Sequence, residues 1–213
     1  MSAPDQTTIL KLAVSADALS PRLASLLALQ RVEEPATLIL PQEVAAGDLV
    51  RGLDDGTYDA GIALATTTTA FTMNAQPLWA DELALAVPLR SPLLAYPEVP
   101  LDALLRYPLL QWCLRACDAL SKQVAARFGP EMHSVKEVTS FDLLAVLVAA
   151  GFAVGIAPRS HIARARGWGV AMRPLTNGPY LISTQLLRKA NGSARAVERF
   201  AERAVKVAAT EAA

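Results

Sequence analysis

In the first 65 residues, short continuous apolar runs are followed in turn by stretches with hydrophobic residues at helical spacing. Three short apolar runs are typical of buried strands: residues 10–14, 37–40 and 59–64. The stretches between them carry leucines at helical spacing, over residues 20–31 and 49–56. Ser20 and Pro21 suit an N-cap and a first helical turn, Gly56 suits a helix end, and we expect Pro41 to stop the second strand. The order β-α-β-α-β predicts a parallel, doubly wound unit.

The same alternation returns in the middle of the chain. The predicted strands are residues 82–88, 108–112, 134–138 and 153–157, and the predicted helices are 101–105, 119–128 and 141–150. A returning strand at 180–187 and an amphipathic helix at 194–207 follow. Two similar units in series predict two α/β lobes.

The composition fits a folded protein without a membrane span. Hydrophobic residues make up 53% of the 213 positions and charged residues 19%. No run of about 20 strongly apolar residues occurs. Residues 1–8 are polar, so we expect a flexible lead and no secretory signal. The only cysteines, Cys113 and Cys117, cannot build a disulfide framework, which favours a cytoplasmic protein.

The charge balance and the few reactive residues exclude several functions. Twenty basic and twenty acidic residues disfavour binding to nucleic acid. The two histidines, His133 and His161, lack partners at metal or catalytic spacing. No glycine-rich phosphate loop occurs. We therefore expect no metal, no cofactor, no catalytic residues and no enzymatic activity.

Four segments resemble one known family. These are residues 10–14 with the Ser20-Pro21 helix, LVRGLDDGTYDAGIAL at 49–64, WADELALAVPLRSPL at 79–93, and LAVLVAAGFAVGIAP at 144–158. Together they are similar to the effector-binding domain of LysR-type transcriptional regulators, over about residues 9–207. The last two segments are fairly specific in combination.

The resemblance implies a fold and a division of the chain. It predicts two Rossmann-like lobes joined by two crossing strands, similar to type 2 periplasmic binding proteins. Lobe one would comprise residues 9–83 plus 183–213, lobe two residues 84–182, with an effector cleft between them. Family members begin with a helix-turn-helix domain, whereas about eight residues precede the first strand here. We therefore expect no direct DNA contact by this chain.

The end of the first strand is one candidate ligand site. Ser15 and Ala16 follow that strand and lead into the helix that begins at Ser20-Pro21. Ligands of open α/β sheets bind at strand ends, and the free N–H groups of a helix N-terminus suit a carboxylate. The alternative is that these serines satisfy only local backbone groups.

The second lobe offers a matching pair. Ser140 and Phe141 open a helix, and the resemblance implies that they contact the effector from the opposite side of the cleft. Ser140 would donate to a carboxylate, while Phe141 would form a pocket wall. The alternative is an N-cap serine with the phenylalanine in the core.

Three further residues complete the predicted site. Thr66 and Thr67 follow the third strand and could contact the ligand, or could simply belong to a solvated loop. Trp112 ends a strand of the second lobe and could reach the ligand, or could only pack in the core. The predicted effector is a small organic or aromatic acid. Glu43, which follows the second strand, weakens the case for an anionic ligand.

The resemblance also implies an antiparallel homodimer. Segments 20–31 and 37–40 of one subunit would lie against 119–128 and 134–138 of the other. Acidic residues outnumber basic ones in the first predicted lobe, and the reverse holds in the second, which favours this pairing.

The sequence therefore predicts a non-enzymatic sensor domain whose ligand shifts the lobes. A solute-binding protein of a transport system with the same fold is the alternative, and an enzyme built on this scaffold is a third possibility for which no acid–base set is visible.

Overall fold

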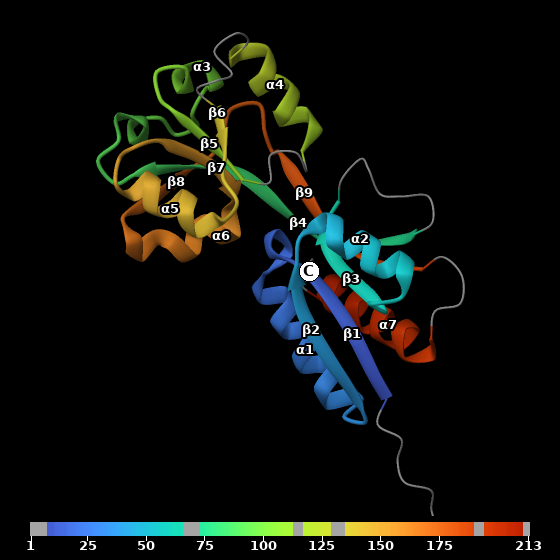
Figure 1. The fold of residues 1–213 in the computed structure, drawn as a ribbon. Coiled ribbons are helices and arrows are strands. Elements are labelled where there is room, and N and C mark those ends of the chain that lie inside the picture. The colour runs from blue at the N-terminus through green and yellow to red at the C-terminus, as the bar shows by residue number, and fades with distance from the viewer. Residues whose placement is uncertain (1–7, 66–72, 113–116, 129–134, 190–193, 211–213) are drawn as a thin grey trace, which may run out of the picture. The chain divides into compact units, whose positions relative to one another are not determined.

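The chain divides into two compact units. The computed structural model describes residues 8–65, 73–112, 117–128, 135–189 and 194–210 (Figure 1). Unit 1 comprises Met1–Trp79 and Ser183–Ala213, and unit 2 comprises Ala80–Ile182. The predicted first lobe spans residues 9–83 plus 183–213, so the two divisions differ at the N-terminus and in where the long strand β4 is cut.

Helices and strands alternate through most of the chain. The strands are β1 (Thr8–Ser15), β2 (Thr37–Val44), β3 (Ala60–Leu64), β4 (Met73–Pro88), β5 (Leu109–Gln111), β6 (Val135–Glu137), β7 (Val154–Pro158), β8 (Val170–Arg173) and β9 (Leu181–Lys189). The helices are α1 (Pro21–Glu33), α2 (Ala46–Asp55), α3 (Leu101–Leu104), α4 (Asp118–Phe128), α5 (Phe141–Ala149), α6 (Arg159–Arg164) and α7 (Arg195–Thr210), with short 3-10 turns η1 (Ala16–Ala18), η2 (Pro92–Ala95) and η5 (Ala165–Trp168). No helix of the described residues is long and apolar enough to cross a membrane.

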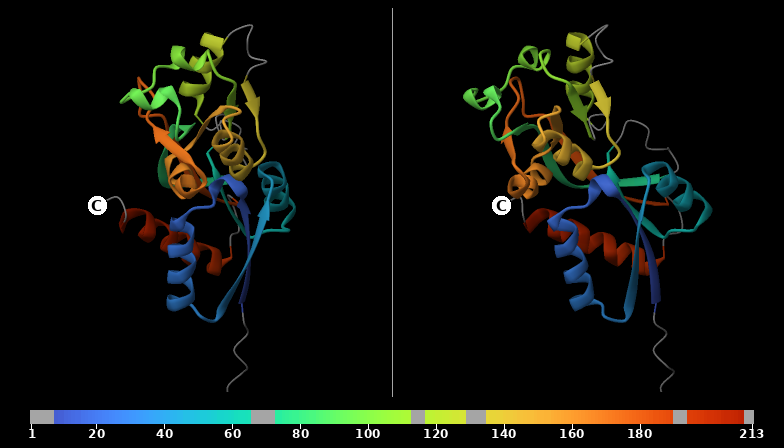
Figure 2. Two further views of the ribbon diagram at one scale, coloured as in Figure 1. Left: turned by 90° about the vertical axis from the view of Figure 1, so that its left-hand side faces the viewer. Right: turned by 60° about the vertical axis from the view of Figure 1, so that its left-hand side comes forward.

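Unit 1 is a sheet covered by helices on both faces. Its strand order is β2-β1-β3-β9, with β1 parallel to β2 and β3, and β9 antiparallel to β3. Side chains alternate along β1, so that Leu10, Leu12 and Val14 pack with α1 and α7. Ala13 lies in a second cluster, with the α2 residues Leu49 and Leu53. Figure 2 shows α1 and α7 side by side.

Unit 2 repeats this arrangement around a second sheet. Its order is β4-β7-β5-β6, with β8 paired to β4. β5 is parallel to both β6 and β7, whereas β4 is antiparallel to β7. Leu144 and Val148 of α5 and Ile162 of α6 pack on one face of this sheet. Gly155 lies against α5, because a Cβ at this position would come within 2.6 Å of Leu144 Cδ2.

Three strands differ from the sequence prediction: β2 and β4 in their bounds, and β8, which was not predicted. β2 runs through Pro41 to Val44, so the expectation that Pro41 ends the strand is wrong. β2 lies at the edge of its sheet and pairs only with β1 among the described strands, and an edge strand tolerates a proline that lacks an N–H. β4 begins at Met73, well before the predicted residue 82.

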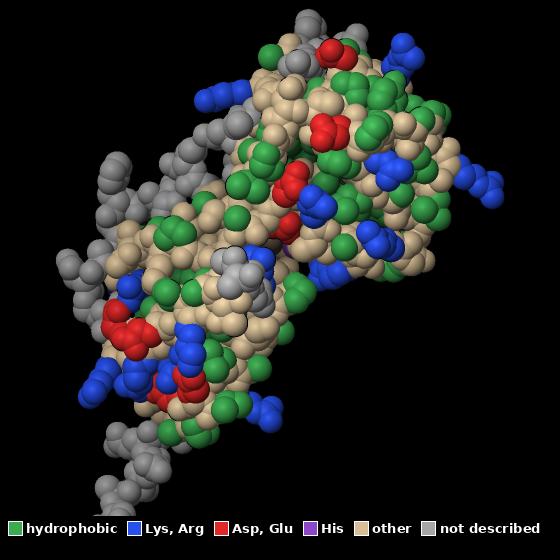
Figure 3. Space-filling view, turned by 180° about the vertical axis from the view of Figure 1, so that it is seen from behind, with side chains coloured by type: hydrophobic (Ala, Val, Ile, Leu, Met, Phe, Trp, Pro, Cys, Tyr) green, Lys and Arg blue, Asp and Glu red, His purple; other side chains and the backbone are tan. Residues whose placement is uncertain are grey.

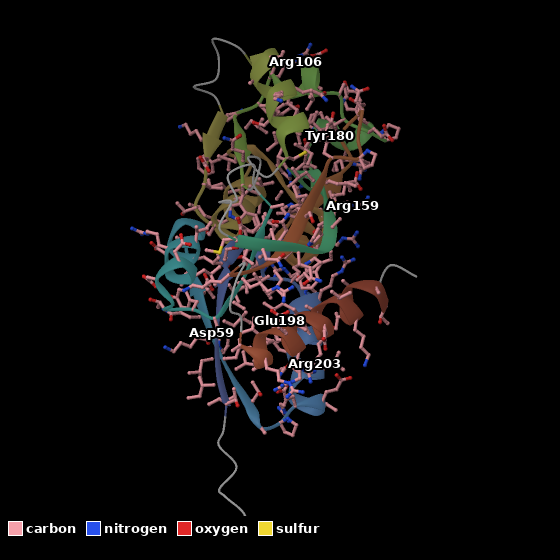
Figure 4. The ribbon with its side chains drawn as sticks, turned by 90° about the vertical axis from the view of Figure 1, so that its right-hand side faces the viewer. Asp59, Arg106, Arg159, Tyr180, Glu198 and Arg203 are labelled. Atoms are coloured by element: carbon pink, nitrogen blue, oxygen red, sulfur yellow. The ribbon has the colours of Figure 1, made fainter. Side chains whose placement is uncertain are left out.

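Charged side chains join α1 to α7 in unit 1. Glu34, just after α1, accepts hydrogen bonds from Arg199 and from Arg203, whose Nη1 lies 2.7 Å from Glu34 Oε2. Glu33 pairs with Arg203 and with Lys206. Figure 3 shows basic and acidic side chains interleaved on this part of unit 1, and Figure 4 shows Arg203 beside α1. These pairs connect the beginning of the chain to its last helix.

Candidate functional site

The ends of three parallel strands meet at one edge of the unit 1 sheet. β1 ends at Ser15, β2 at Val44 and β3 at Leu64, and the register pairs Ser15 with Val44. In open α/β sheets the carboxyl ends of the strands are the usual place for a ligand. The sheet thus places Ser15 where the sequence analysis expects a site.

Ser15 is already engaged at this edge. Its side chain is buried, with 2% exposure, and its hydroxyl donates to Asp17 Oδ1 at 2.5 Å and lies 3.4 Å from the Ile62 carbonyl oxygen. The chain turns here into η1, which puts Ala16 on the surface and brings Asp17 back towards Ser15. Burial raises the pKa of the Asp17 carboxyl, and the Ser15 hydrogen bond partly offsets this.

The first helix begins where predicted, but its cap is incomplete. α1 starts at Pro21, and Ser20 has the extended backbone of an N-cap residue. The Ser20 hydroxyl makes no capping hydrogen bond, and its oxygen is buried without a partner among the described residues. The segment between β1 and α1 therefore holds, besides the Asp17 carboxyl, the Ser20 hydroxyl oxygen, which can still form a hydrogen bond.

In unit 2, three aromatic rings gather at the corresponding edge of the sheet. β5, β6 and β7 are parallel and end at this edge. The ring centroids of Trp112 and Phe141 are 5.7 Å apart, and the His161 ring lies 4.8 Å from the first and 5.4 Å from the second. Edge-to-face contacts of this kind stabilise aromatic clusters. The structure thus brings two of the predicted site residues together and adds a third ring.

Ser140 caps the helix that carries Phe141. Its hydroxyl oxygen accepts a hydrogen bond from the Leu143 N–H at 3.3 Å, which confirms the predicted N-cap. Ser140 is exposed, and its hydroxyl proton is still available to a ligand. Phe141 and Trp112 are 5% and 7% exposed and belong to the core of unit 2.

His161 is a buried imidazole, and its spacing along the chain gave no sign of a place in the site. It is 4% exposed, and burial lowers its pKa to about 4, so the ring is neutral near neutral pH. Its Nδ1 lies 3.2 Å from Ser160 Oγ, whereas its Nε2 is buried without a hydrogen-bond partner among the described residues. The sequence carries no signal for this contact, because the pairing of β5 with β7 brings distant segments together.

Other predicted residues contribute less to the site. Thr66 and Thr67 lie outside the described residues. Arg159, labelled in Figure 4, pairs with Glu82, and Arg173 donates to the Leu94 carbonyl oxygen. Within the described segments, no group of His, Cys, Asp and Glu is arranged to hold a metal ion.

Known proteins share this fold. The BenM effector-binding domain with its effector benzoate has a TM-score of 0.78 at 19% identity, over 96% of this chain and 94% of that one. The reduced form of OxyR from N. meningitidis has a TM-score of 0.76 at 16% identity, over 94% and 95%. Full-length BenM matches with a TM-score of 0.78 at 19% identity, over 96% of this chain and 69% of that one. No curated protein sequence matches significantly.

These solved structures confirm the predicted fold class. They have the two-lobed α/β architecture of type 2 periplasmic binding proteins. A sequence model described as the LysR substrate binding domain matches residues 5–209. Because that match covers nearly the whole chain and the fold agrees with it, the chain belongs to the LysR substrate-binding domain family.

Proposed function

We propose that this chain senses a small-molecule effector within a LysR-type transcriptional regulator. The observation that carries the proposal is the family match over residues 5–209. The family consists of regulatory domains and not of enzymes, which agrees with the predicted lack of catalytic residues. In an intact regulator, an effector with different affinities for two arrangements of the lobes would shift their equilibrium and so control transcription. Such a regulator acts on DNA, so we place it in the cytoplasm.

The second unit supports an organic acid with an apolar body as the effector. The N-terminus of α5 presents free backbone N–H groups and a partial positive charge, which suit a carboxylate. The exposed Ser140 hydroxyl adds a donor, and the neighbouring rings of Trp112 and Phe141 suit an aromatic or aliphatic group. The relative BenM has benzoate as its effector, which makes benzoate a sensible first probe.

A thermal-shift titration tests this proposal. Binding to the folded state raises the melting temperature by an amount that saturates with ligand concentration. We would titrate benzoate, other aromatic acids and aliphatic acids against the wild type and Ser140→Ala. The matched control is Ser91→Ala, because Ser91 also caps a helix of unit 2 by accepting from a backbone N–H, that of Leu93. Loss of the shift in Ser140→Ala alone supports the proposal, whereas the absence of a shift with every acid contradicts it.

We also propose that the domain forms a homodimer through the edge of unit 1. β2 is an edge strand, and its Leu38 and Leu40 are 49% and 44% exposed. Beside it, α1 and β2 border a pocket of about 280 Å³ whose lining includes Leu27 and Gln30. Gln30 is 1% exposed, and its Nε2 has no partner among the described residues. An edge strand with exposed apolar side chains is typical of a surface that a partner covers.

The mass of the domain in solution tests the dimer. Light scattering during gel filtration at micromolar concentration should give a dimer for the wild type and a monomer for Leu40→Glu. The control is Phe152→Glu, because Phe152 is 71% exposed in unit 2, outside the predicted interface segments. A monomeric wild type, or a dimer that survives Leu40→Glu, would rule out this edge as the interface.

A further inference from the structure

Unit 2 carries a pocket at the end of its sheet that lies opposite Trp112. The pocket measures about 290 Å³ and is lined by parts of three connections: Pro88, Arg90, Ser91 and Pro92; Tyr107 and Pro108; and Gly151, Phe152, Ala153 and Val154. Pro108 and Ala153 directly precede the parallel strands β5 and β7, whereas Trp112 follows β5. The pocket therefore lies where these strands begin, while ligands of open α/β sheets usually bind where such strands end.

Backbone hydrogen bonds fix the turn that presents Phe152 beside this pocket. After α5, the Gly151 N–H donates to the Val148 carbonyl oxygen at 2.9 Å, and Gly151 has a φ of 78°. The Phe152 N–H donates to the Leu147 carbonyl oxygen at 3.0 Å. At a helix end of this kind, a hydrophobic side chain in the place of Phe152 commonly packs back on the helix. Phe152 is instead 71% exposed, so a fixed backbone holds its ring out beside the pocket.

The other two connections are also constrained. Tyr107 is fixed at the end of α3, where its N–H donates to the Leu104 carbonyl oxygen at 2.9 Å. The turn that carries Arg90 is closed by the Ser91 N–H, which donates to the Pro88 carbonyl oxygen at 3.0 Å. Proline fixes its own φ, and three prolines line the pocket. The walls are therefore ordered before a ligand arrives, which lowers the entropic cost of binding.

Arg90 gives this pocket a positive charge that no neighbour neutralises. Its side chain is exposed, and it forms no ion pair among the described residues. Neither Asp nor Glu occurs among the described lining residues. The Ser91 hydroxyl oxygen accepts from the Leu93 N–H at 3.2 Å, so its proton is available as a second donor. The polar groups of the pocket therefore favour an anion over an amine.

The remaining lining defines the body of the ligand. Aromatic and proline rings suit a flat apolar group, and a guanidinium binds a carboxylate through charge-assisted hydrogen bonds. We propose that this pocket binds a small aromatic carboxylic acid, with its carboxylate at Arg90 and its ring beside Phe152 and Tyr107. This site is separate from the effector site proposed at Ser140, and a second ligand molecule would occupy it.

A titration followed by NMR tests this site separately from the other. The backbone amide signals of Arg90 and Phe152 report the pocket, and those of Ser140 report the proposed effector site. The probes are 3-phenylpropanoate, its neutral amide 3-phenylpropanamide, and the saturated 3-cyclohexylpropanoate. The variants are Arg90→Gln and Phe152→Ala, both at exposed side chains, and the control is Arg166→Gln, an exposed arginine of unit 2 that does not line the pocket.

We expect the pocket of the wild type to bind 3-phenylpropanoate at least about threefold more tightly than the amide, a modest factor because the ion pair is exposed. Arg90→Gln should remove this preference, and Arg166→Gln should keep it. Phe152→Ala should weaken binding of the aromatic acid by about two- to tenfold, since a ring contact is lost.

Three results would overturn the proposal. The first is that the Arg90 and Phe152 signals do not move with 3-phenylpropanoate, and the second is that Arg90→Gln leaves the preference for the acid unchanged. The third is that the saturated acid binds as tightly as the aromatic one, which contradicts the aromatic class. In each case the Ser140 signals still test the proposed function independently.

Discussion

Replacing Glu34 with glutamine should destabilise the domain near neutral pH and make it less sensitive to acid. Glu34 lies after α1 and joins it to α7 through Arg199 and Arg203, and it also accepts from Thr37 Oγ1 at 2.7 Å. Its side chain is 12% exposed. Glutamine can keep one acceptor oxygen but loses the charge that both arginines face.

The pKa of Glu34 sets the size of the effect. The hydrogen bonds from Arg199 lower this pKa most, to about 2 from the ordinary 4.5. At about 1.4 kcal/mol for each pH unit, the carboxylate stabilises the folded state by at most about 3.5 kcal/mol. Arg199 is 38% exposed, so solvent screens part of this and we expect roughly 1–2 kcal/mol.

The pH dependence follows from the direction of the shift. Because the folded-state pKa is lower than the unfolded one, the contribution is complete above pH 4.5 and is lost as the pH falls towards 2. Urea unfolding followed by far-UV circular dichroism should therefore show the largest gap between wild type and Glu34→Gln near neutral pH. The two stabilities should converge in acid.

Glu43→Gln is the matched control, because Glu43 is an exposed carboxylate on β2 with no ion pair among the described residues. It should match the wild type throughout. Equal unfolding midpoints for Glu34→Gln and Glu43→Gln near neutral pH would refute the reasoning, and so would a gap of constant size down to pH 2.

Two other predictions concern the core of unit 2. Gly155→Ala should lower the free energy of unfolding by about 1–3 kcal/mol, measured in urea, because its Cβ would clash with Leu144 at 2.6 Å; a change within experimental error would contradict this packing. His161→Phe should flatten the pH dependence of the melting temperature between pH 6.5 and 4. In this range the unfolded imidazole binds a proton that the folded one, with its pKa lowered to about 4 by burial, does not, so wild-type stability falls as the pH drops. An unchanged slope in the variant would count against a neutral, buried His161.

Local sequence patterns predicted the ends of helices well where a single residue determines the backbone conformation. Gly56 adopts a positive φ of 84° at the end of α2, and Ser140 caps α5, as their sequence positions indicate. The rule that proline ends a strand failed at Pro41, because it holds for strands paired on both sides and β2 is an edge. β8 has four residues, of which only Val170 is buried, so its sequence carries no alternation to detect.

The candidate site could be predicted only in part, because its side-chain contacts depend on how distant segments pack together. Strand ends can be located from sequence, which is why Ser15, Trp112 and Ser140 were placed at sheet edges. The contacts of these residues depend on tertiary geometry. Asp17 meets Ser15 only because the chain forms a 3-10 turn there, and His161 meets Trp112 only because β7 lies beside β5 in the sheet.

The two units present different chemistry at equivalent places. In unit 1 the parallel strands end at a buried serine, Ser15, that donates a hydrogen bond to the Asp17 carboxyl. In unit 2 they end at aromatic rings and a capped helix N-terminus. The likeness to BenM, at 19% identity, shows a shared fold and does not show which groups stand at the strand ends. The class of effector must therefore be argued from those groups.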